Sequence, residues 1–164
     1  MILVGGVAEL YQGDLDLGRV AVGRLAGEEL GPEVLVEELS YGAVAVAQRL
    51  QDLRPDILVL IAAQARGRPP GTVERREIEP LALSVKELQL AVGDAVTGYV
   101  TIDLLLRVAT ALRALPARTV AIEVEPASVQ PSEELTLEAR LGLEDALVLV
   151  RTEVAALRRV SARG

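Results

Sequence analysis

The chain has 164 residues, of which 24 are acidic and 17 basic, giving a formal net charge of −7 at neutral pH. This charge repels a phosphate backbone, and the absence of Phe and Trp removes the aromatic side chains on which nucleic-acid bases stack best. We therefore expect no nucleic-acid partner. Neither cysteine nor histidine is present, which excludes disulfides, thiolate metal sites and catalytic triads built on either residue. The length favours one domain spanning residues 1–164.

Membrane insertion is not expected. The longest uninterrupted apolar run covers residues 57–63, whereas about 20 residues are needed to cross a bilayer. The chain does not open on the basic, apolar and small-residue series of a signal peptide. These features predict a cytoplasmic protein.

The first part of the chain alternates strand and helix. Residues 2–6 form an apolar run, residues 13–18 a turn-rich link, and residues 17–30 an apolar-periodic stretch that predicts a helix. Residues 33–39 predict a strand and residues 43–53 a helix. Residues 56–62, apolar after Asp56, predict a central strand that is buried on both faces, as in a largely parallel sheet.

The second part completes the predicted sheet. Residues 66–71 predict a turn, and the highly charged residues 72–79 predict an edge strand. Ser84 and Glu87 have the spacing of a capping box. Residues 101–115 predict a helix, residues 119–124 a strand, and residues 136–160 a helix with a break at Gly142. The sum is a three-layer α/β fold, with a mostly parallel twisted sheet of about five strands and helices on both faces.

Ligands in such sheets usually bind where loops leave the carboxyl ends of the strands. The loop at residues 7–18 carries Glu9, Asp14 and Asp16, whose oxygens are suited to a hard metal ion. The same carboxylates also fit an ordinary acidic loop in which Asp16 is the N-cap of the following helix. Neither the dinucleotide fingerprint nor the P-loop pattern occurs, so we do not expect a nucleotide site.

The order of segments resembles the hydrogenase maturation proteases. The resemblance lies in residues 6–18 (GVAELYQGDLDLG), which are similar to the family's opening loop, and in residues 57–73 (ILVLIAAQARGRPPGTV), which are similar to its apolar strand and Pro-Gly-Thr turn. It continues through residues 83–88 and 116–136, so that it covers nearly the whole chain. The resemblance implies the fold of enzymes that remove the C-terminal extension from the large subunit of nickel-iron hydrogenases.

The family recognises nickel through an acidic residue in the first loop, an Asp after the central strand and a His near the segment that LALSVKEL resembles. In this sequence those positions read Leu15, Ala62 and Lys86. Two of these side chains are hydrocarbon and the third is protonated at neutral pH, so none can serve as the expected ligand. The family's loop Asn is replaced by Glu9, whereas Asp14 matches the first acid of the family's acidic pair.

Two alternatives remain open from the sequence. A one-residue slip in the first loop places Asp16 rather than Leu15 at the ligand position. The ammonium of Lys86, the only lysine, either pairs with Asp14 or Asp16 in place of a cation or lies in solvent on a helix face. The side chains singled out as cleft candidates are Glu9, Asp14, Asp16, Gln64 and Lys86.

Three functions fit these observations. The first is a relative of the maturation proteases that does not cut and that binds a protein partner such as a hydrogenase-like large subunit. The second is an active metal-dependent endopeptidase with a rearranged carboxylate site. The third is a small-molecule or regulatory binding domain on the same scaffold. No catalytic or metal-binding residue is assigned and no cofactor is expected, with nickel bound only if the site is rearranged.

Overall fold

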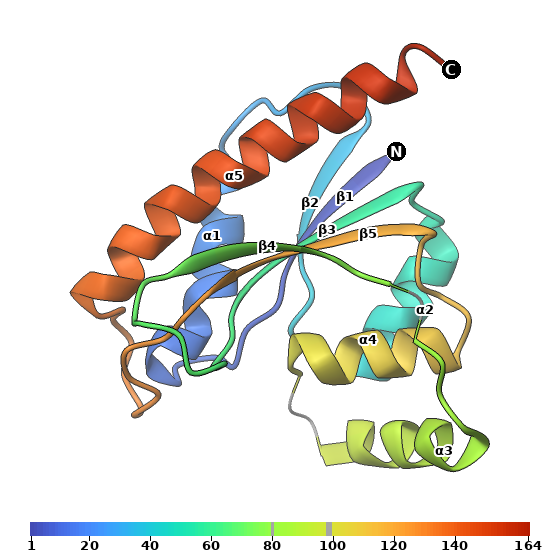
Figure 1. Ribbon diagram of the computed structural model, residues 1–164, viewed down its shortest axis with the longest axis horizontal. Helices are drawn as coiled ribbons and strands as arrows, with labels where there is room; N and C mark the ends of the chain where they lie inside the picture. Colours follow the sequence, from blue (N-terminus) through green and yellow to red (C-terminus); the bar gives the residue numbers. More distant parts are fainter. Residues whose placement is uncertain (80, 98–99) are drawn as a thin grey trace.

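The computed structural model describes residues 1–79, 81–97 and 100–164. Within these ranges one five-stranded sheet has the strand order β2-β1-β3-β5-β4 (Figure 1). The first four strands in this order are parallel and the last is antiparallel to its neighbour. The strands are β1 (Ile2–Gly6), β2 (Val34–Glu38), β3 (Ile57–Ala63), β4 (Val73–Glu77) and β5 (Arg118–Val124).

Helices cover both faces of the sheet, which confirms the predicted three-layer α/β fold. One face packs against α1 (Leu17–Leu25) and α5 (Leu137–Ser161), and the other against α2 (Ala43–Leu53) and α4 (Ile102–Ala111) (Figure 1). Outside α4 lies α3 (Val85–Asp94), in which Ala91 is the only buried residue. Two short 3₁₀ turns complete the described elements, η1 (Gly13–Asp16) and η2 (Ala95–Thr97). No helix in the described ranges is both long and apolar enough to span a bilayer.

The central and edge strands differ as their sequences predict. Every residue of β3 is buried, because this strand lies between β1 and β5 and has helices on both faces. β4 lies at the sheet edge and carries the charged sequence VERRE. Its Arg75 reaches across to Glu153 of α5, with 2.7 Å between Nε and a carboxylate oxygen. Charge of this kind at an edge discourages pairing with strands of other chains.

The predicted break in the last helix is wrong, because α5 runs without interruption through Gly142. A Cβ atom at this position would lie 2.6 Å from Cγ1 of Val124 and 2.8 Å from the backbone oxygen of Gly71. The glycine therefore permits close packing of α5 against β5 and the turn before β4. Its role concerns tertiary packing and not the local end of a helix.

Two other helices end before their predicted residues. α1 ends at Leu25 instead of residue 30, since the chain turns at Gly27 and then leads to β2. α4 ends at Ala111 instead of residue 115, because Arg113 adopts the left-handed conformation, with φ of 53°. A non-glycine residue in this region is uncommon and interrupts the helical hydrogen-bond ladder.

Side-chain caps mark the starts of α3, α4 and α5. The predicted capping box of α3 is confirmed, with the Ser84 hydroxyl accepting from the backbone N–H of Glu87 and the Glu87 carboxylate accepting from the backbone N–H of Ser84. Thr101 caps α4 by accepting a hydrogen bond from the backbone N–H of Leu104. Thr136 caps α5 by accepting from the backbone N–H of Ala139. The caps at Thr101 and Thr136 both lie beside the candidate site.

Candidate functional site

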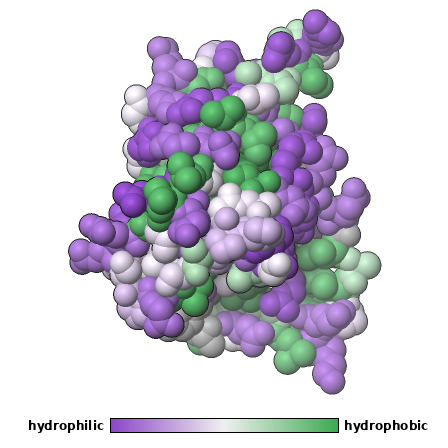
Figure 2. All heavy atoms as spheres, turned by 60° about the vertical axis from the view of Figure 1, so that its left-hand side comes forward, coloured by the Kyte–Doolittle hydropathy of each residue, from purple (hydrophilic) through white to green (hydrophobic). Residues whose placement is uncertain are grey.

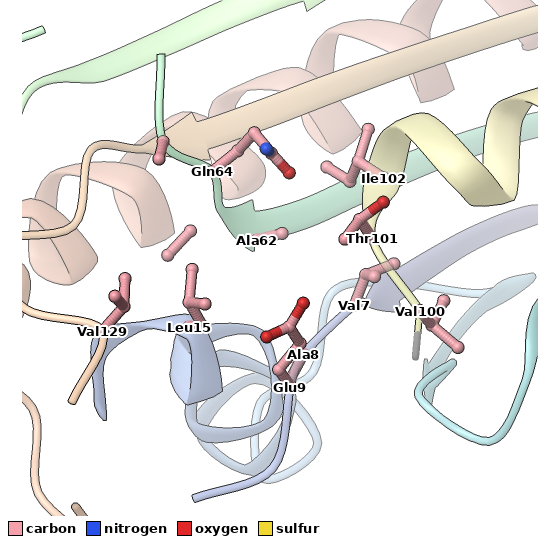
Figure 3. Close-up of a pocket in the computed structure, with 12 residues that line it drawn as sticks. Val7, Ala8, Glu9, Leu15, Ala62, Gln64, Val100, Thr101, Ile102 and Val129 are labelled. Atoms are coloured by element: carbon pink, nitrogen blue, oxygen red, sulfur yellow. The ribbon is translucent and has the colours of Figure 1, made fainter. Parts of the chain in front are cut away.

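A small pocket lies where the loops after β1 and β3 meet the start of α4 (Figure 3). β1 and β3 are neighbours in the sheet, but the strands that follow them in the chain lie on opposite sides. β2 lies beside β1 at one side, and β5 and β4 lie beyond β3 at the other. Such a switch point is the usual ligand position in an open α/β sheet. The pocket has a volume of about 120 Å³ and is lined by Val7, Ala8, Glu9, Leu15, Ala62, Ala63, Gln64, Ala65, Val100, Thr101, Ile102 and Val129.

Backbone hydrogen bonds fix the loop that forms the lower wall. The N–H of Val7 donates to the carbonyl of Ile61, which ties the end of β1 to β3 at 3.0 Å. The N–H of Glu9 donates to the carbonyl of Leu15, also at 3.0 Å, so the loop folds back on itself. Glu9 and Leu15 consequently line the same pocket.

Three polar side chains face a mainly apolar wall. In Figure 3 the Glu9 carboxylate and the Gln64 amide extend from opposite walls, whereas the Thr101 hydroxyl lies at the start of α4 and accepts from the backbone N–H of Leu104. Partial burial raises the pKa of Glu9 above its usual value. No side chain in the described part of the chain donates a hydrogen bond to this carboxylate or forms an ion pair with it. It is also the only charged group among the lining residues.

Four residues selected from the sequence do lie together here. Glu9 and Gln64, two of the five cleft candidates, line the pocket. Leu15 and Ala62, which occupy the expected acidic ligand positions, line it as well. The two loops singled out from the sequence therefore meet at one pocket, where Leu15 and Ala62 contribute hydrocarbon to the lining.

Asp14 is not available to a ligand, because its buried carboxylate holds a distant loop. It accepts hydrogen bonds from the backbone N–H groups of Ala127 at 2.8 Å and Ser128 at 3.0 Å. It also accepts from the backbone N–H and the hydroxyl of Thr136, both at 2.8 Å. These four bonds fasten η1 to the segment between β5 and α5, which indicates a structural role.

Asp16 is also occupied. It stands at the N-cap position of α1, as the sequence predicts, but no backbone N–H of the helix donates to its side chain. Its carboxylate instead accepts from Arg19, with Nε and Oδ1 separated by 2.9 Å. The Arg19 guanidinium also lies 5.3 Å from the ring centroid of Tyr11, a cation–π distance.

Lys86 lies outside the pocket. It is exposed in the first turn of α3, and no ion pair joins it to Asp14 or Asp16, whose carboxylates are held by other groups. The solvated helix-face interpretation is therefore the one that the structure supports. The start of α4, with Val100, Thr101 and Ile102, closes this side of the pocket, which the sequence did not predict.

Sequence reasoning also missed an ionic network beside the pocket. Glu123 and Glu125 near the end of β5 are almost completely buried. Glu123 accepts hydrogen bonds from Arg66 at 2.6 Å and from Arg76 at 2.9 Å. Glu125 accepts from Nε of Arg68 at 2.9 Å and from the backbone N–H groups of Arg66 and Arg68. The sequence did contain an indication of this network, since Glu123 interrupts the apolar strand VAIEV. A buried charge requires a partner, so such a glutamate predicts a nearby cation.

The hydrogen bonds from arginine control the ionisation of this network. Burial alone raises the pKa of Glu123, but the bonds from Arg66 and Arg76 outweigh that effect and hold the pKa below its usual value. The pKa of Glu125 is lowered in the same way, by Arg68 and the two backbone N–H groups against the effect of burial. Both glutamates are thus charged and paired at neutral pH.

The pocket does not fit a nickel ion. Its donor set is one carboxylate, one amide and one hydroxyl, and imidazole is absent from the chain. Among the described residues, no three acidic side chains are grouped closely enough to hold a metal ion. A divalent cation usually requires several charged or imidazole ligands, so the lining chemistry is wrong for this metal.

Comparison with solved structures gives several close matches in fold. The crystal structure of the hydrogenase 2 maturation peptidase from a Thaumarchaeota archaeon superposes with a TM-score of 0.68 at 25% identity, covering 93% of this chain and 97% of that one. The hydrogenase maturating endopeptidase HybD from E. coli gives 0.66 at 24% identity, covering 97% and 93%. The [NiFe] hydrogenase maturation protease HycI from Thermococcus kodakarensis gives 0.59 at 18% identity, covering 93% and 90%. No protein-family model and no curated protein sequence matches the chain.

Proposed function

Because this chain is a divergent structural relative of the hydrogenase maturation proteases, we propose that it is a non-catalytic member that binds a hydrogenase-like large subunit. The observation that carries this proposal is the chemistry of the pocket at the switch point. Leu15 and Ala62 line it where carboxylates are expected, and Glu9 is its only charged residue. The scaffold for recognition is retained, but the ligands for a metal-dependent cut are not.

Exposed apolar side chains near the pocket support partner binding. Leu10 and Tyr11, on the loop after β1, are 44% and 54% exposed, and Val129 at the pocket wall is 46% exposed. Figure 2 shows this side of the molecule, where hydrophobic groups lie among hydrophilic ones. Apolar groups at the mouth of a cavity, surrounded by polar ones, are typical of a surface that receives another protein.

The two alternative functions receive less support. A rearranged carboxylate site requires Asp14 and Asp16, and both carboxylates are held by protein donors. A small-molecule site usually has a volume of about 300 to 1,000 Å³. The pocket, at about 120 Å³, is below that range.

The test combines the purified chain with the precursor of a nickel-iron hydrogenase large subunit that retains its C-terminal extension, with and without nickel. Light scattering after size exclusion measures complex formation, and intact mass spectrometry measures cleavage. We expect a one-to-one complex and an unchanged precursor mass. Release of the extension would establish an active peptidase, and the absence of a complex would overturn the proposed partner.

A pair of matched variants locates the surface. Val129→Glu places a charge at the pocket mouth and is expected to weaken the complex by about tenfold or more, the range of an interface hot spot. Val148→Glu makes the same change on the exposed side of α5, where Val148 is 57% exposed, and should leave the affinity unchanged. Equal loss in both variants would show that the pocket mouth is not the contact.

A further inference from the structure

The Glu9 carboxylate differs from the buried acidic groups at the carboxyl edge of the sheet. Asp14, Asp16, Glu123 and Glu125 are each held by hydrogen bonds from the protein. Glu9 accepts none from the described residues, although it is partly withdrawn from water and borders apolar walls. Partial removal from water destabilises the charged form of a carboxylate, and a bound cation would offset this cost.

The size of the pocket limits what that cation can be. A protein cavity of about 150 Å³ is large enough to admit benzene. The pocket here, at about 120 Å³, therefore admits one side chain or a group of similar size. A bare divalent metal is disfavoured, because one carboxylate is too small a ligand set.

The lining residues indicate which kind of partner side chain the pocket can bind. Leu15, Ala62 and Ile102 offer apolar contact, while Glu9 supplies the negative charge. Gln64 adds an amide group on the wall opposite Glu9 (Figure 3), while the Thr101 hydroxyl is engaged as the cap of α4. Lysine and arginine combine an alkyl stem with a cationic head, and they bury the stem while the head finds a polar partner.

We propose that the pocket binds a lysine or arginine side chain of the protein partner, with the alkyl stem against the apolar walls and the cationic head on the Glu9 carboxylate. This inference rests on the proposed function for the identity of the partner, but the pocket chemistry itself does not depend on it. The organic cation thus occupies the switch-point pocket from which the expected metal ligands are missing.

The first experiment tests the pocket without any partner. Methyl groups of Ala62 and Leu15 are followed by carbon–proton NMR while n-butylammonium chloride is added, and n-butanol serves as the uncharged probe. We expect saturable shifts with the ammonium and at least about tenfold weaker binding of the alcohol. Equal responses to both probes, or no response to either, would overturn the inference.

Variants identify the charge that is responsible. Glu9→Gln should weaken n-butylammonium binding by about tenfold or more, and Glu9→Asp should retain part of the affinity because it keeps the charge. Glu29→Gln makes the same charge change in the exposed segment between α1 and β2 and should have no effect. Thermal unfolding of each variant verifies that the fold is intact. Equal affinity in wild type and Glu9→Gln would contradict the assignment of Glu9.

The second experiment separates this inference from the proposed function. The affinity for the large-subunit precursor is measured for wild type and Glu9→Gln, and a weaker complex of the variant is expected. If both bind the precursor equally, the proposed function stands and the pocket inference fails. If n-butylammonium binds through Glu9 but the precursor does not bind, the pocket inference stands and the proposed partner fails.

Discussion

Two neighbouring regions at the carboxyl edge of the sheet differ in whether their acidic side chains are paired with basic ones. Around β4 and β5, the buried Glu123 and Glu125 are surrounded by Arg66, Arg68 and Arg76. Around β1 and β3, the pocket contains only the unpaired carboxylate of Glu9. The first arrangement has little capacity left for a ligand, whereas the second has a charge without a protein partner. Ionisable residues alone therefore do not mark the site, and their existing partners must be considered.

The largest effect is expected from Glu123→Ala in the network. Removing the buried carboxylate takes the shared partner from the partly exposed guanidiniums of Arg66 and Arg76, although Arg66 keeps its pair with Asp103. We expect a loss of about 3 kcal/mol in the free energy of unfolding, because hydrogen bonds to a charged group contribute about 1.5–3 kcal/mol each. Urea denaturation measures it. The control is Glu144→Ala, which breaks the exposed pair with Arg24 and should change stability little.

The packing beside the network is tested at Gly142. The added methyl group of Gly142→Ala would collide with Val124 and Gly71, so we expect a loss of about 1–3 kcal/mol in unfolding free energy, as for other overpacked sites. Gly93→Ala in α3 is the matched control, because nothing lies within 4 Å of the new methyl group. It should raise stability slightly through helix propensity. Equal responses of the two variants would show that Gly142 is not a packing constraint.

Acid should weaken the network through the same glutamates. Their pKa values lie below the usual 4.5 in the folded protein, so the folded state binds fewer protons than the unfolded state as the pH falls. The stabilisation is therefore present above about pH 4.5 and is lost as the pH drops through the folded pKa values. Thermal unfolding between pH 7 and pH 3 measures this loss, and Glu123→Ala should make it smaller. A variant as acid-sensitive as the wild type would contradict this account.

The smallest stability effect is expected in the pocket. Glu9→Gln removes no protein hydrogen bond or ion pair in the described chain, and it removes a charge from apolar surroundings. We expect the unfolding free energy to stay within about 0.5 kcal/mol of the wild type, with any change in the stabilising direction. A loss comparable to that of Glu123→Ala would mean that Glu9 has a structural partner and would remove the contrast between the two regions.

Much of the fold follows from local sequence patterns. The apolar run of β3, the charged β4 and the capping box at Ser84 were all predicted, because each depends on residues close in the chain. The structural role of Asp14 could not be predicted from local patterns, because its hydrogen-bond donors lie far along the chain, in the segment before α5. Gly142 was misjudged for the same reason, because its role comes from contact with β5.

The site was predicted in part. The two loops that form the pocket were identified, and with them Glu9, Leu15, Ala62 and Gln64. The contribution of α4 was missed because residues 101–115 predict only a helix, and a helical pattern gives no information on which distant loops the helix start meets. The network was missed although Glu123 interrupts an apolar strand, since its arginine partners come from other parts of the chain.

The central claim is that the pocket no longer serves a metal, and calorimetric titration with nickel tests it most directly. The wild type is compared with the double variant Leu15→Asp and Ala62→Asp, which places two carboxylates beside Glu9 in one pocket. We predict no stoichiometric binding by the wild type and one-to-one binding by the double variant, because three carboxylates form an adequate oxygen ligand set. Tight one-to-one binding by the wild type, abolished by Glu9→Gln, would contradict the account.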